Sequence, residues 1–185
     1  MLRSLLNFCA IALLIVTPAH GYETRIPYKS KFAGGWFIHA SSDYCTMMKT
    51  IEERPPSHKV EFQLTYFPSR ESSMVTVSSE SWQALLKNNY KDIPAEFRFD
   101  DITFNAVKSG RIFAPRPVPP RISFFFDKET TPSLLDTLHR SKTMAITADG
   151  RPLGPYVMAA VPEAIGELMN CIKAAKQVLA DDPFR

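Results

Sequence analysis

The stretch "VEFQLTYF", residues 60–67, decides the fold, because apolar and polar side chains alternate along it. Positions 60, 62, 64 and 66 are apolar, whereas positions 61, 63 and 65 are polar. Since successive side chains of a strand point to opposite faces, this period of two predicts a β-strand with one buried face. The turn "SRESS" (69–73) and a second strand, "MVTVSS" (74–79), follow at once, which predicts an antiparallel hairpin.

Strand patterns also occur on both sides of this hairpin. In "GGWFIHAS", Trp36, Ile38 and Ala40 should share one face, with His39 on the other. In "EFRFDDITFNAV", two alternating pieces around Asp100 predict a bent strand or a second hairpin. The remaining predicted strands are "RISFFFD" (121–127), "TMAITADG" (143–150) and "YVMAAV" (156–161), and residues 22–31 are predicted to be an irregular lead-in.

Three segments have helical spacing. Residues 79–92 predict a short helix, and residues 131–142 predict a second one with Thr131 as cap and Pro132 at the first helical position. The best helix begins near Pro162 and runs almost to the C-terminus. Its predicted buried stripe consists of Ile165, Leu168, Met169, Ile172 and Leu179. The order of these elements predicts the α+β class, as one domain over residues 22–185, with a mostly antiparallel sheet, short helices and a C-terminal helix packed on the sheet.

The N-terminus has the pattern of a secretory signal peptide. Arg3 precedes an apolar run from Leu5 to Val16, and small residues precede a cleavage site between Gly21 and Tyr22. We therefore expect residues 1–21 to be removed and the protein to be periplasmic or secreted. Removal of this segment lowers the formal charge from +3 to +2, because it contains one basic residue and no acidic one. That balance does not favour a nucleic-acid partner, and we expect no transmembrane segment in the mature chain.

The three cysteines are Cys9, Cys45 and Cys171, and Cys9 leaves with the predicted signal peptide. Cys45 follows His39, two serines and Asp43, so it could be a nucleophile with His39 as base, a metal ligand or half of a disulfide. Two remaining cysteines in an exported protein favour a bridge between Cys45 and Cys171. No paired-ligand spacing predicts a metal, and no nucleophile elbow or phosphate loop is present. We therefore predict neither a cofactor nor a catalytic residue.

Residues 108–121 form a Pro/Arg-rich segment that we interpret as an exposed loop or edge, since proline cannot donate to a sheet ladder. Arg111, Phe113, Arg116 and Arg121 are its candidate binding residues. Proline-rich segments lose little entropy on docking, and arginine is enriched at interfaces. The alternative is that this segment is a rigid connector without a binding role, and that its arginines only keep it soluble. Most aromatic side chains are predicted to be core, with Phe125 the one expected to be exposed or to pack under a helix.

The tryptophan strand that leads to "DYC" and the closing strand and helix with "AIGELMNC" resemble small exported proteins of alphaproteobacteria. The plan is loosely similar to the invasion-associated locus B type of periplasmic protein. This resemblance covers the Cys45 region and the last third of the chain. It implies an envelope location, and no functional residue is transferred from it.

These observations favour an exported, non-enzymatic protein that binds a protein or another component of the cell envelope. One alternative is an envelope hydrolase or thiol enzyme. Another is a small inhibitor of an extracellular hydrolase, which would present a rigid loop at residues 114–120.

Overall fold

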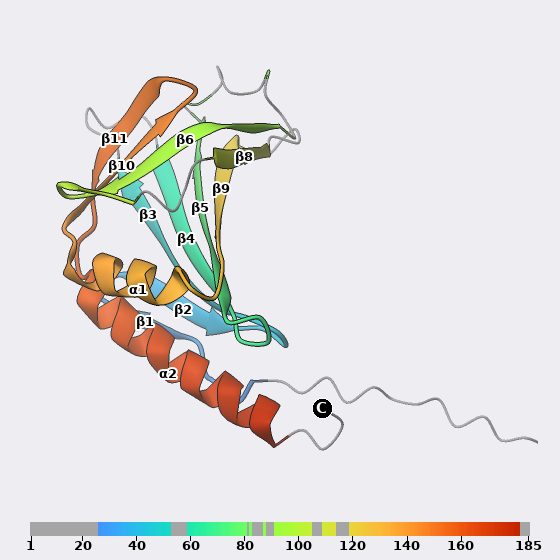
Figure 1. Ribbon diagram of the computed structural model, residues 1–185. Coiled ribbons are helices and arrows are strands. Elements are labelled where there is room, and N and C mark those ends of the chain that lie inside the picture. The colour runs from blue at the N-terminus through green and yellow to red at the C-terminus, as the bar shows by residue number, and fades with distance from the viewer. Residues whose placement is uncertain are drawn as a thin grey trace, which may run out of the picture.

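The computed structural model describes residues 26–52, 59–80, 82, 87, 91–104, 109–113 and 119–181. The predicted signal peptide at residues 1–21 and most of the predicted helix at residues 79–92 lie outside these ranges. Within them, the chain forms an open antiparallel sheet of 11 strands and two helices, one of them C-terminal (Figure 1). The predicted α+β class is therefore confirmed. No helix in the described part of the chain combines the length and apolar character needed to cross a membrane.

The strand order is β1-β2-β3-β4-β5-β9-β8-β6-β10-β11, and β7 pairs with β6 beside this path. The predicted hairpin forms its centre, with Leu64 opposite Val75. The strands are β1 (Lys31–Ala33), β2 (Trp36–Ala40), β3 (Cys45–Glu52), β4 (Lys59–Phe67), β5 (Ser72–Ser79), β6 (Asp92–Phe99), β7 (Ile102–Thr103), β8 (Ser109–Phe113), β9 (Arg121–Phe126), β10 (Thr143–Ala148) and β11 (Arg151–Val157).

The sheet curves so that its apolar face encloses the core. Phe97 of β6 and Phe124 of β9 lie with ring centroids 5.0 Å apart, although β8 separates their strands in the sheet. Gly110 of β8 makes this approach possible, because a Cβ at that position would collide with Ile122 and contact Phe124. On the outer face, Phe125 is 64% exposed, which is one of the two environments predicted for it.

The helices α1 (Thr131–Arg140) and α2 (Val161–Ala180) lie side by side at one end of the sheet, opposite the end that β6 and β8 cross (Figure 1). The α2 helix packs on β1, β2 and β3. Trp36 anchors this arrangement, because its indole Nε1 donates to the carbonyl of Ala159, just before α2, at 2.8 Å. The helices therefore hold the first strands of the sheet close to the end of β11.

Two details of the predicted helices are wrong. The cap of α1 is Thr130 rather than Thr131, whose buried hydroxyl donates to the carbonyl of Asp127 at 2.7 Å. The residues expected on the buried stripe of α2 include Met169, which is 47% exposed. Met169 follows Leu168 on the helix and thus turns away from the sheet towards α1.

Strand boundaries also differ from the sequence-based predictions. Residues 45–52 form β3, which the pattern did not predict, and β1 begins at Lys31, the last residue of the expected lead-in. The predicted strand at 156–161 lies instead at Arg151–Val157, where an edge position tolerates the prolines. Part of the segment that we interpreted as an exposed loop or edge is instead β8, an interior strand between β9 and β6, which ends at Phe113 before the first proline of the segment.

Candidate functional site

The predicted disulfide is present. Cys45 begins β3 and Cys171 lies within α2, with the sulfurs 2.03 Å apart and the Cα atoms 6.0 Å apart. Both side chains are fully buried. The bridge fastens the first half of the sheet to the C-terminal helix. Since a bridged sulfur has no thiolate, Cys45 in this form cannot act as the nucleophile considered above.

The residues near Cys45 in sequence do not surround it in space. His39 pairs with Thr46 in the register of β2 and β3, so the two share a face of the sheet. Cys45 precedes Thr46 and therefore points to the opposite face. The His39 ring stacks against Phe37 at 5.5 Å between centroids, and its buried Nδ1 has no hydrogen-bond partner. Across the described ranges, no three His, Cys, Asp or Glu side chains are grouped so that they could hold a metal ion.

Three of the predicted binding residues, Arg111, Phe113 and Arg121, lie on the paired strands β8 and β9, with Phe113 opposite Arg121. Arg111 donates two hydrogen bonds to Asp92 at 3.0 and 3.1 Å, and these lower the pKa of that carboxyl. The Arg121 guanidinium lies 4.5 Å from the ring centroid of Phe113, which is a cation–π contact. Arg116 belongs to residues 114–118, outside the described ranges. Two of the three arginines thus have intramolecular partners, and a binding role for this hairpin stays a prediction.

A larger candidate site is a hollow of about 420 Å³ between α1 and α2, which we call the α1–α2 groove. Its volume falls in the range of roughly 300–1,000 Å³ that is typical of small-molecule sites. The end of β4 and the turn between β4 and β5 close it on one side. The groove is lined by Tyr66, Glu71, Lys128, Thr131, Pro132, Leu135, Met169, Ile172 and Lys176.

The walls of the groove are apolar. Pro132 and Leu135 come from the first turns of α1, and Met169 and Ile172 come from α2. Met169 is half exposed, and methionine adapts its shape to irregular apolar partners more readily than branched side chains do. The two helices therefore leave apolar surface open between them that closer packing would have covered.

One end of the groove is charged. The two carboxylate oxygens of Glu71 contact different ammonium groups, Lys128 at 2.6 Å and Lys176 at 2.7 Å. These hydrogen bonds lower the pKa of Glu71 to about 2 and raise the pKa of both lysines. Two cations face one anion here, so the groove end carries a net positive charge.

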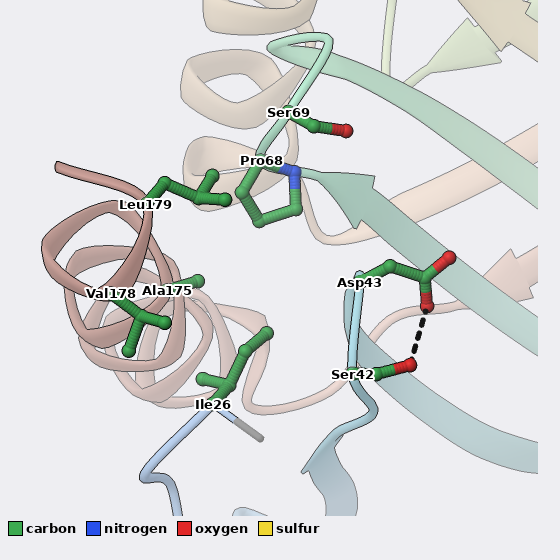
Figure 2. Close-up of a pocket in the computed structure, with 8 residues that line it drawn as sticks. All are labelled: Ile26, Ser42, Asp43, Pro68, Ser69, Ala175, Val178 and Leu179. Carbon is green, nitrogen blue, oxygen red and sulfur yellow. Dashed lines mark hydrogen bonds between the residues drawn. The ribbon is translucent and has the colours of Figure 1, made fainter. Parts of the chain in front are cut away.

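A second, smaller pocket of about 170 Å³ is lined in part by Pro68 and Ser69 of the β4–β5 turn (Figure 2). Val178 and Leu179 of α2 lie on one side of it, and Ser42 and Asp43 lie on the other. Ser42 donates a hydrogen bond to Asp43 at 3.4 Å, which is a weak contact. The pocket has no cation and less than half the volume of the α1–α2 groove, so the groove is the better candidate.

Sequence reasoning missed every charged residue of the groove. Glu71, Lys128 and Lys176 lie on three separate elements, and Glu71 and Lys176 are 105 positions apart. No local pattern links them. Met169 was predicted to be buried against the sheet, whereas it is half exposed and lines the groove.

Comparison with protein-family models, with curated proteins and with solved structures found no match to this chain. The candidate site therefore depends on the geometry alone, and the similarity to invasion-associated locus B proteins stays a prediction.

Proposed function

We propose that this protein is an exported, non-enzymatic binding protein of the cell envelope, and that the α1–α2 groove holds the apolar part of its ligand. The observation that carries this proposal is the open apolar wall formed by Leu135, Met169 and their neighbours. Burial of such surface is the main source of binding free energy for an apolar chain. A lipid-like envelope component fits this chemistry.

The disulfide supports the location. Bridges persist in oxidising compartments such as the periplasm and the extracellular space, and they are rare in the cytosol. Cys45 and Cys171 form one that is fully buried. The expected signal peptide at residues 1–21 agrees with the same location.

An uncharged apolar dye, such as phenylnaphthylamine, tests the proposal, because its fluorescence rises when it leaves water. We expect saturable binding to the wild-type protein and at least about tenfold weaker binding to Met169→Asp, since a carboxylate on the groove wall must be desolvated when the dye binds.

The matched control is Val157→Asp. Val157 is 66% exposed on the edge strand β11 and does not line the groove. This variant should bind the dye as the wild type does. Equal dye affinity of the Met169→Asp and wild-type proteins would show that the groove is not the site.

A further inference from the structure

We propose that Lys128 and Lys176 form the subsite for the carboxylate head of a fatty acid, and that Glu71 is an internal carboxylate which this head displaces. The inference rests on the proposed function, because it assigns the ligand class of the same groove. It makes Glu71 a competitor of the ligand.

The geometry of the ion pairs defines the chemistry of the subsite. A single carboxylate bridges the two ammonium groups, with one oxygen 2.6 Å from Lys128 and the other 2.7 Å from Lys176. Charge-assisted hydrogen bonds of this length are typical of ammonium and carboxylate groups. The two lysines are thus already spaced for a carboxylate.

Glu71 is a displaceable occupant of this subsite. Its side chain is 38% exposed, and those of Lys128 and Lys176 are 67% and 48% exposed. Ion pairs with this much solvent exposure contribute little to stability. Glu71 also has a φ of 51°, in the left-handed region that non-glycine residues seldom adopt. Loss of the lysine contacts would therefore let the β4–β5 turn relax.

The apolar wall continues from the charged end. Ile172 is one helical turn before Lys176 on α2, and Met169 is three residues further back. Residues spaced by three or four positions lie on the same side of a helix. A carboxylate held by the lysines would thus extend its alkyl chain along Ile172 and Met169 towards Leu135. The net positive charge at one end and the apolar wall beyond it match a fatty acid.

Calorimetric or dye-displacement titrations with dodecanoate and with dodecanol test this assignment, because the two ligands share an alkyl chain and differ in the charge of the head. We expect the wild-type protein to bind dodecanoate about fivefold more tightly than dodecanol. Glu71→Gln should tighten dodecanoate binding by a similar factor and leave dodecanol binding unchanged. Lys176→Gln should remove the preference for the acid.

Added salt gives a second measurement that does not depend on a variant. The preference for dodecanoate should fall as ionic strength rises, because the subsite is exposed to solvent. Weaker or unchanged dodecanoate binding by Glu71→Gln would overturn the role of Glu71 as competitor. Equal affinity of the wild-type protein for both ligands would overturn the carboxylate subsite while leaving the groove intact.

Two further outcomes separate this inference from others. If neither dodecanoate nor dodecanol binds, the proposed function fails together with the subsite. If dodecyl phosphate or a short peptide with a free carboxylate binds more tightly than dodecanoate, the fatty acid assignment is wrong and a different acidic ligand occupies the groove.

Discussion

Removal of the disulfide should destabilise the protein strongly. We consider Cys45→Ala, Cys171→Ala and the double variant. The bridge joins residues separated by 126 positions. If the bridge acts mainly by lowering the conformational entropy of the unfolded chain, a loop of this length adds about 5 kcal/mol to the free energy of unfolding at 25 °C. For a chain of this size, that is a decrease in Tm of about 10–20 °C.

Urea and thermal unfolding followed by circular dichroism measure this effect. Each single variant already breaks the bridge, so the double variant should be only slightly less stable than either one. The m-value should rise, because an unfolded chain without the cross-link exposes more surface. A loss below about 1 kcal/mol would refute the loop argument. Additive effects of the two single variants would refute it equally, since they would indicate two independent packing sites.

Three further predictions concern the sheet and its link to α2. Gly110→Ala should lower the free energy of unfolding by about 1–3 kcal/mol, because the added methyl group collides with Ile122. Denaturant unfolding measures this loss. The pKa of Asp100 lies below its usual 3.8 because it accepts a hydrogen bond from the Thr143 hydroxyl and from backbone amides. The ionised Asp100 carboxylate should therefore make its full contribution to the free energy of unfolding above pH 3.8. This contribution should be lost as the pH falls through the lower pKa of the folded state. Asp100→Asn should flatten this part of the pH–stability profile. Trp36→Phe should cost about 1–2 kcal/mol in thermal unfolding, because the carbonyl before α2 loses its indole donor.

Much of the sheet could be predicted from the sequence because its strands each bury one face. β4, β5 and β9 alternate clearly, and the pairing of β4 with β5 follows from the short turn between them. β3 did not follow this pattern. Met47 is buried and Met48 is half-buried on the other face, and the buried Thr46 hydroxyl is satisfied by Thr65 at 3.1 Å. A buried polar residue whose hydrogen-bond partner lies on a neighbouring strand cannot be recognised from the alternation of apolar and polar residues along the sequence.

The disulfide was predictable because export and cysteine counting left Cys45 with one partner, and neither step needs geometry. The groove was not predictable for the opposite reason. Its charged end depends on three elements meeting in space, with Glu71 in a turn, Lys128 before α1 and Lys176 on α2.

The most direct test of the binding proposal is an NMR titration of protein labelled at the methionine methyl carbons, with dodecanoate added below its micelle concentration. Met169 lines the groove, whereas Met47 and Met144 are fully buried in the core and report any general disturbance. We predict a saturable shift of the Met169 methyl signal with little change at Met47 and Met144. A Met169 signal that stays fixed while dodecanoate binds elsewhere, or that moves only together with the core methyl groups, would contradict the account.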